Sequence, residues 1–414
     1  MTETRDYQVM ARYCDYRADD ETVYRALRST VLPLMRVWEQ LKGAQRIVIK
    51  FNQDFRKART PYFQGMRQQL VSDKVARALI RLLREQTRAE LLYTDITAFS
   101  RTDDPSPPPT ARIADLMREW GVIYLNGDRP PHKVYDVPGG GQMFRQYLLP
   151  EEIVEADALI NVQRLKNHKF MGTTLTLKNL FGLIPREPYG RSRQYFHHLV
   201  RMPYMLADVA RIFKPTLNIL DALISQAGEE WGRGNGQVRI TNALIAGDHT
   251  IATDAFGMAY MGHDPDVDWP VQPCLRDRNP VLVAAEGGFG TIDVDKIDVD
   301  SDVEPNPPGT FYARQTDTMA RTISWRRTTC EQALQYRDNV REYLDKYAGE
   351  YILLQQGEVK WHDPSSVLKV SRRRLAGENP DEAMWLKYVD PEEAEGEHFE
   401  VYERTLAQMA EMGV

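Results

Sequence analysis

The sequence predicts an α/β protein with a mostly parallel, Rossmann-like sheet, helices on both faces, and a small C-terminal α+β module. Short β-branched runs alternate with segments of helical periodicity as far as about residue 300, and this alternation is typical of βαβ units. From Asp300 onward the composition changes, and a Pro-rich linker leads into a strongly charged tail. The alternation therefore predicts the main fold, and the shift in composition predicts the module.

The elements follow in the order that a parallel sheet requires. Ser72 and Asp73 precede an apolar helical pattern, with short strand-like runs before and after it, so that a strand, a helix and a strand succeed one another. The elements predicted over the main fold are a helical pattern at 23–34, a strand at 46–52, a helix at 75–83, strands at 90–95, 123–126 and 158–162, a helix at 113–120, a helix at 203–213, strands at 216–221 and 242–247, and a helix at 250–261.

The domain division follows the same two signals. Residues 1–300 are expected to form the α/β domain, with a division into two lobes of about 1–150 and 151–300 left open. Residues 301–414 form the charged module, in which strand-like segments around Gln355-Gln356-Gly357 predict a hairpin. Because the linker separates the two compositions, residues 1–300 alone are expected to fold as a soluble unit.

Composition limits the class of function. The 53 basic and 59 acidic residues give a formal net charge of −6, which argues against nucleic-acid and anionic-membrane partners. The polar N-terminus carries no secretion signal, and no apolar run reaches membrane-spanning length, so the prediction is a soluble, cytoplasmic protein. The cysteines Cys14, Cys274 and Cys330 are scattered, which predicts reduced thiols and no iron–sulfur cluster.

The chemistry is predicted to lie between Asn161 and His198. Within it, the block that starts at Arg164 comes directly after a predicted strand, where a parallel sheet opens to a crevice. It contains three of the eight histidines, which offer acid–base chemistry or metal ligation. Lysines and a Gly-Thr-Thr turn in the same segment suit a carboxylate or phosphate. The candidate residues are, as catalytic groups, Lys178, His168, His197 and His198, and, as substrate or cofactor contacts, Lys50, Asn52, Lys166, Gly172, Thr173, Thr174 and Asn179.

Lys178 is the strongest of these candidates. It lies among Leu175, Leu177, Leu180 and Phe181, and a lysine in apolar company must reach a polar cavity or pair with an anion. For Lys166 and Lys169 a solvated charge is the more ordinary interpretation. His197 and His198 are adjacent and cannot share one helix face, so one of them at most is expected to act.

Two buried-looking carboxylates leave alternatives open. Asp221 and Asp254 each sit within apolar runs, where a carboxylate needs a partner. A divalent metal is one candidate cofactor, with His168, His197, His198 and Asp221 as its ligands. For Asp254 a helix cap or another structural role is favoured.

The segment LKNHKFMGTTLTLKNLFGLIP, from Leu165 to Pro185, followed by a downstream histidine, resembles the family known as Domain of Unknown Function 362. The resemblance covers roughly residues 40–300. Further matching pieces in the same order are IVIKFN (47–52), ALINVQRLKNH (158–168), LNILDAL (217–223) and IAGDHTIATDAF (245–256). This resemblance implies a fold and a site but no reaction.

The order of His168, Lys178 and then His197 or His198 also resembles that in the nickel-pincer lactate racemases. In that family the lysine holds a pyridinium-derived cofactor covalently, and the later histidine ligates nickel. The resemblance implies racemase chemistry at Lys178. The intervening sequence departs from the racemase pattern.

These observations favour an enzyme acting on a small anionic, carboxylate-bearing metabolite, by isomerase or oxidoreductase chemistry that a metal could assist. No nucleophile elbow or zincin motif is present to indicate a hydrolase. Two alternatives remain: a metal- or cofactor-handling accessory protein without turnover, and an interaction protein that recruits a partner through its C-terminal module. The sequence leaves the oligomeric state open, a homo-oligomer included.

Overall fold

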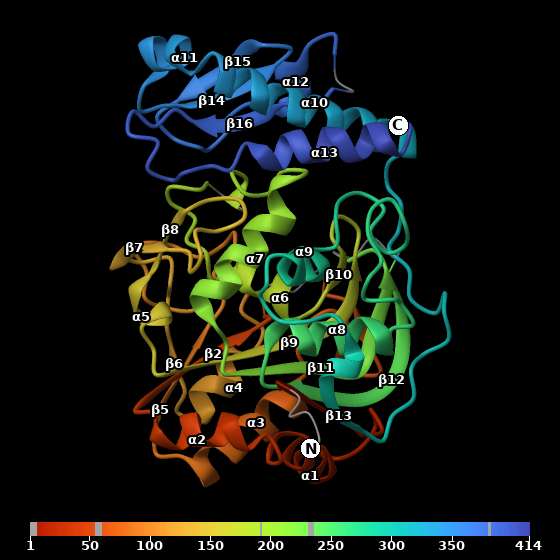
Figure 1. Ribbon diagram of the computed structural model, residues 1–414. Helices are drawn as coiled ribbons and strands as arrows, with labels where there is room; N and C mark the ends of the chain where they lie inside the picture. The colour runs from red at the N-terminus through yellow and green to blue at the C-terminus, as the bar shows by residue number, and fades with distance from the viewer. Residues whose placement is uncertain (1–5, 54–59, 191–192, 231–235, 380–381) are drawn as a thin grey trace.

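A computed structural model describes residues 6–53, 60–190, 193–230, 236–379 and 382–414. The main fold is built on one large twisted sheet in the strand order β13-β1-β12-β11-β9-β2-β5-β6, with β10 paired to β9 (Figure 1). Its strands are β1 (Tyr7–Tyr13), β2 (Arg46–Phe51), β5 (Glu90–Thr94), β6 (Ile123–Tyr124), β9 (Ala158–His168), β10 (Gly172–Thr174), β11 (Leu217–Gly228), β12 (Gly236–Gly247) and β13 (Ile297–Ser301).

The sheet is mostly parallel, as predicted. β11, β9, β2, β5 and β6 run parallel as consecutive neighbours. β12 is antiparallel to both β11 and β1, whereas β13 runs parallel to β1. Because β2 pairs directly with β9, the segments on either side of residue 150 belong to one sheet. The predicted α/β fold class is confirmed.

Helices cover both faces of the sheet. One face is packed by α1 (Asp20–Val31), α2 (Met35–Gly43), α3 (Asp73–Gln86) and α4 (Ala114–Glu119), and the other by α6 (Thr176–Asn179), α7 (Arg201–Phe213), α8 (Thr250–Tyr260) and α9 (Pro280–Glu286) (Figure 1). Both faces of β2 are buried, because successive side chains of a strand point to opposite faces. Ile47 and Ile49 pack in the core beneath α1 to α4, and Val48 packs in the core beneath α6 to α9. Lys50 follows the same alternation and lies on the Val48 face.

Smaller elements complete the main fold. They are two short antiparallel hairpins, β3 (Tyr62–Phe63) with β4 (Met66–Arg67) and β7 (His132–Asp136) with β8 (Gln146–Pro150), and the single helical turn α5 (Glu151–Val154).

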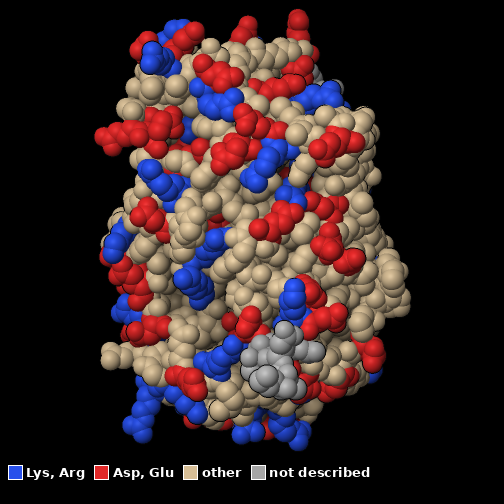
Figure 2. All heavy atoms as spheres, viewed as in Figure 1, with Lys and Arg blue, Asp and Glu red and all other residues tan. Residues whose placement is uncertain are grey.

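Among the described helices none is long and apolar enough to cross a membrane. The face in Figure 2 intersperses basic and acidic side chains, without one extended patch of either sign.

The C-terminal module is an α+β unit, as predicted. A three-stranded antiparallel sheet of β14 (Tyr351–Gln355), β15 (Glu358–Asp363) and β16 (Trp385–Tyr388) is accompanied by α10 (Met319–Asp338), α11 (Val340–Tyr347), α12 (Arg372–Ala376) and α13 (Glu400–Glu411). β14 and β15 form the hairpin predicted from the Gln-Gln-Gly turn. The extended segment between β13 and α10 runs along the side of the main fold (Figure 1).

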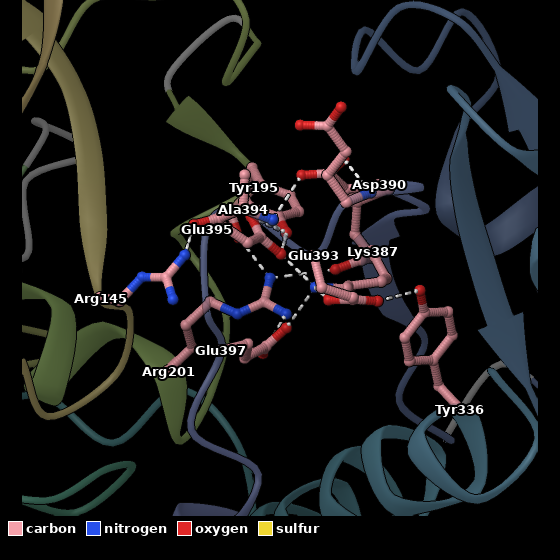
Figure 3. Close-up of polar contacts among 12 residues, drawn as sticks. Arg145, Tyr195, Arg201, Tyr336, Lys387, Asp390, Glu393, Ala394, Glu395 and Glu397 are labelled. Carbon is pink, nitrogen blue, oxygen red and sulfur yellow. Dashed lines mark hydrogen bonds and ion pairs between the residues drawn. The ribbon is translucent and has the colours of Figure 1, made fainter.

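The module packs against the main fold through buried charges. Glu397 accepts a hydrogen bond from Arg201 of α7 at 2.9 Å and one from Lys387 of β16 at 3.0 Å, and all three side chains are 0% exposed (Figure 3). Glu395 contacts Lys387 and accepts a 2.7 Å hydrogen bond from the Tyr195 hydroxyl. Apolar side chains of the module, Trp385 among them, also belong to the same core as those around α7. The module is therefore bound to the main fold by both charge and apolar packing.

Candidate active site

A cavity of about 350 Å³ lies at the carboxyl ends of β2, β5 and β9. This is the edge at which open parallel sheets bind ligands. The residues lining it are Lys50, Asn52, Asp95, Ile96, Thr97, Ala98, Phe99, Gln163, Lys166, His168, Thr174, Lys178, Asn179, Phe181, Gly182, Arg193 and His197. Eight of the eleven candidate residues predicted from sequence are among them.

Four basic side chains converge on this cavity, namely Lys50, Lys166, Lys178 and Arg193. Two ionisable carboxylates lie close by, since Asp95 lines the wall and Glu230 is buried next to His168. An excess of cations over anions in a partly desolvated space favours an anionic ligand.

Lys178 has the position that its apolar neighbours predicted. It is carried by α6, its ammonium stands 4.5 Å from the centre of the Phe181 ring, and it makes no ion pair or hydrogen bond with any described residue. Arg193 lies over the same ring at 4.8 Å. Burial, with the neighbouring Arg193 charge next, lowers the pKa of Lys178 to about 7. The amine is thus poised to exchange its proton near neutral pH.

Lys50 belongs to a clamp that shapes the cavity wall. Its ammonium contacts Asp95 at 2.9 Å and donates to the Asn179 side-chain oxygen at 2.7 Å. Asn179 in turn donates to Asn161 at 2.7 Å, so its amide is already engaged by protein. A Cβ at Gly182 would stand 2.6 Å from the Lys50 side chain, which explains why glycine occupies that position. In this structure Lys50 and Asn179 therefore hold the wall.

Lys166 is buried, which corrects the interpretation of a solvated charge. It is 1% exposed, donates to the backbone oxygen of Gln69 at 3.0 Å, and has its pKa lowered to about 8 chiefly by burial. β9 continues to His168, well beyond the predicted end at 162, and carries Lys166 into the cavity wall. The predicted strand was too short because polar residues occupy its far end.

Uncharged polar atoms also face the cavity without protein partners. Among the described residues, both side-chain polar atoms of Gln163, the Asn52 Oδ1 and the Thr174 hydroxyl are buried and accept or donate no hydrogen bond within the protein. Buried polar groups are normally paired. These three residues therefore offer donors and acceptors to a ligand bound beside the cations.

His168 is held in one tautomer. Its Nδ1 accepts hydrogen bonds from the backbone amides of Phe170 at 3.0 Å and Met171 at 3.1 Å, so Nε2 carries the proton. That Nε2 lies 3.4 Å from Glu230. Burial and the Lys178 charge lower the pKa of His168 well below its ordinary value. The ring is thus a neutral hydrogen-bond donor.

His197 and His198 diverge, as expected of adjacent residues. His197 lines the cavity between the rings of Phe170 and Phe181, and burial together with the Lys178 charge lowers its pKa to about 3. His198 does not line this cavity; it accepts a hydrogen bond from Arg372 of the module at 3.1 Å.

The metal set predicted from sequence is not assembled. Asp221 is buried in an ion pair with Arg164 at 2.9 Å and accepts from the Ser72 amide at 2.8 Å, away from the histidines. Across the described parts of the chain, no three His, Cys, Asp or Glu side chains gather to hold a metal ion. Asp221 is therefore a structural carboxylate, and His168 has one ring nitrogen already occupied.

The Gly-Thr-Thr turn contributes one residue to the cavity lining, although all three were predicted to contact the ligand. Thr174 lines the cavity, whereas Gly172 and Thr173 do not. Gly172 has φ +74° and leaves no room for a Cβ against the Pro273 carbonyl, 2.9 Å away. Its role is to allow this close approach and the pairing of β10 with β9.

Asp254 anchors the turn that carries Lys178. Its carboxylate accepts hydrogen bonds from the Thr176 amide at 2.8 Å, the Thr176 hydroxyl at 2.6 Å and the Leu177 amide at 2.7 Å. These are groups at the start of α6, so the structure has the helix-cap role favoured from sequence.

Replacing Asp254 by alanine should cost about 2 to 4 kcal/mol of unfolding free energy, because two backbone amides at the start of α6 lose their buried acceptor. Asp254→Asn keeps one acceptor oxygen and should lose less. Denaturant unfolding of both variants measures the difference. Equal, near-zero losses would show that α6 does not depend on this carboxylate.

Sequence reasoning missed four residues of the site: Asp95, Gln163, Arg193 and Glu230. Gln163 could have been found, since it lies in β9 three residues before Lys166. Asp95 follows β5 directly, where its neighbour β2 places Lys50. Arg193 and Glu230 come from irregular segments that no local pattern orients.

The comparisons with known proteins assign most of the main fold to one family. The family described as Domain of unknown function (DUF362) matches residues 47–259, and the chain belongs to this family. A thylakoid-associated protein of Synechocystis sp. is 30% identical over 149 residues, covering 32% of this chain and 44% of the relative. The chain thus matches less than half of the length of that relative. The likeness to lactate racemases has no counterpart in these comparisons.

Proposed function

We propose that this protein is an enzyme that binds a small carboxylate-bearing metabolite in the cavity beside Lys178 and moves a proton next to the carboxylate. The observation that carries the proposal is the half-buried Lys178 ammonium, which faces the cavity without an anionic partner among the described residues. A bound carboxylate would supply the missing charge.

The surrounding groups fit the remaining parts of such a substrate. Arg193 and Lys166 add positive charge near Lys178. The Nε2–H of His168 suits a substrate hydroxyl or carbonyl oxygen, as a neutral imidazole donor. The unpartnered amide of Gln163 can bind a second oxygen.

Proton transfer is the chemistry that these residues support best. The carboxylate and the adjacent cations would stabilise negative charge that develops when the neighbouring carbon loses its proton. His197, whose ring nitrogens donate or accept no hydrogen bond with described residues, is the candidate acceptor of that proton, because a bound anion would offset the cations that help to lower its pKa. An isomerase or racemase needs no more than this, whereas an oxidoreductase needs a redox cofactor in addition.

Carboxylate affinity should fall as the pH rises above about 7. The ammonium form of Lys178 binds the carboxylate, and the pKa of this lysine in the empty site is about 7. Affinity should be constant below that pH and should then fall by up to about tenfold per pH unit, until the pKa of the complex is reached. Calorimetric titration with small 2-hydroxy and 2-oxo carboxylates from pH 6 to 9 measures this, and an affinity independent of pH would contradict it.

Turnover is tested by incubating the protein with the tightest-binding carboxylate in D₂O. Loss of the proton signal at the carbon next to the carboxylate shows proton transfer. Binding without exchange would favour the accessory-protein alternative, and exchange only after a redox cofactor is added would favour an oxidoreductase.

A further inference from the structure

A second and larger cavity lies where the C-terminal module meets the main fold. Its volume is about 600 Å³, and its wall includes His197 and His198 from the main fold together with residues of α10 and α12. His197 lines both cavities and is the one residue that the two described linings share.

Arginines from three separate parts of the chain line the second cavity. Arg276 comes from the main fold, Arg321 from α10 and Arg372 from α12. Trp325 helps to hold the first two, with the Arg276 and Arg321 guanidinium carbons at 5.1 Å and 5.8 Å from its ring centre. Asp317 pairs with Arg276 at 2.8 Å, which fixes that side chain in the wall.

Arg372, unlike Arg276, has no carboxylate partner among the described residues. Its one hydrogen bond runs to His198 at 3.1 Å, and it makes no ion pair with a described carboxylate. Glu382, the one carboxylate in the described lining, makes no ion pair with it. Burial, followed by the Arg201 charge, lowers the pKa of Arg372 to about 10. A guanidinium that keeps N–H donors beyond its one bond to His198 can bind the oxygens of a phosphoryl group.

We infer that the second cavity binds a phosphoryl group, and that it holds the phosphorylated end of the same substrate whose carboxylate lies beside Lys178. The substrate class is therefore a phosphorylated carboxylate that extends from one cavity to the other beside His197. The placement of the carboxylate beside Lys178 rests on the proposed function. The phosphoryl site is inferred from the arginines of the second cavity alone.

Inorganic phosphate is the first probe, titrated calorimetrically into the full-length protein. Arg372→Met should weaken phosphate binding at least tenfold, and Arg372→Lys, which keeps the charge but not the fork, should fall between it and wild type. Arg374→Met removes an exposed arginine of the same helix and should leave binding unchanged.

The second probe is a series of straight-chain phosphonocarboxylates of increasing length. At one length the affinity should exceed that of both phosphate and acetate by at least tenfold, because one molecule then fills both subsites. Lys178→Met and Arg372→Met should each remove this gain.

Three results would overturn the inference: phosphate that does not bind, phosphate binding that Arg372→Met leaves intact, or no length of phosphonocarboxylate that binds better than the separate anions. Failure of the proposed function has a different pattern. In that case acetate binding is absent or insensitive to Lys178→Met, while phosphate still depends on Arg372.

Discussion

Replacing Lys178 by methionine is expected to abolish carboxylate binding while making the folded protein more stable. The ammonium lies in the cavity without a described anionic partner, and burial lowers its pKa to about 7. The folded state therefore bears the cost of a poorly solvated charge that only the ligand offsets. Methionine keeps the bulk of the side chain and removes that charge.

The effect on stability depends on pH in a defined sense. An unfolded lysine keeps its proton up to about pH 10, whereas the folded one begins to lose it near pH 7. Below pH 7 both states carry the charge, so the burial cost is present in full. As the pH rises from 7 to 10 the unfolded state binds more protons, so this group's penalty disappears. The gain from Lys178→Met should be about 1 to 3 kcal/mol at pH 6 and should shrink toward pH 10.

Calorimetric melting and ligand titration test both halves. The carboxylate affinity should fall at least about 30-fold, which corresponds to ~2 kcal/mol. Lys346→Met removes an exposed lysine of α11 and should change neither quantity. If Lys178→Met and Lys178→Ala both unfold, Lys178 is a structural partner. If both still bind carboxylates, the ligand site lies elsewhere.

The periodic parts of the fold were predictable because burial acts on local sequence. The β-branched run of β2 and the apolar helix α3, with its Ser72 cap, occur where their patterns predicted them. β1 and β13 were not predicted: β13 is the edge strand and β1 is its neighbour, and both carry polar residues that resemble a loop.

The candidate site was predictable to the extent that strands and their ends carry it. Lys178 was predicted because a charged side chain among apolar neighbours needs a polar cavity or an anion. Lys50 and Lys166 lie near the carboxyl ends of the buried strands β2 and β9. The second cavity was not predictable. Arg372 meets His198 only after the module has docked, and no local pattern reports a contact between residues 174 positions apart.

Docking of the module also changes the expectation for the isolated main fold. The linker and the shift in composition suggested a separable unit, but Arg201 is 0% exposed and pairs with Glu397 of the module. The rings of Phe144 and Tyr195 lie within 5.5 Å and 4.7 Å of the same Arg201 guanidinium, at the junction drawn in Figure 3. Removing the module would expose these aromatic side chains together.

A chain ending at residue 318, which keeps β13 and the linker, is therefore expected to be aggregation-prone or to lack a cooperative melt.

In the full chain, Glu397→Gln should lower the free energy of unfolding by about 3 to 5 kcal/mol, because Arg201 and Lys387 both lose a buried carboxylate. Glu392→Gln, at an exposed position of the same loop, should cost less than about 0.5 kcal/mol. Denaturant unfolding compares the two full-length variants, and near-ultraviolet circular dichroism reports packing in the shortened chain. A soluble, cooperatively melting 1–318 chain with the near-ultraviolet spectrum of a packed core would show that the main fold is independent. The Arg201–Glu397 pair would then serve to place the second cavity rather than to hold the protein together.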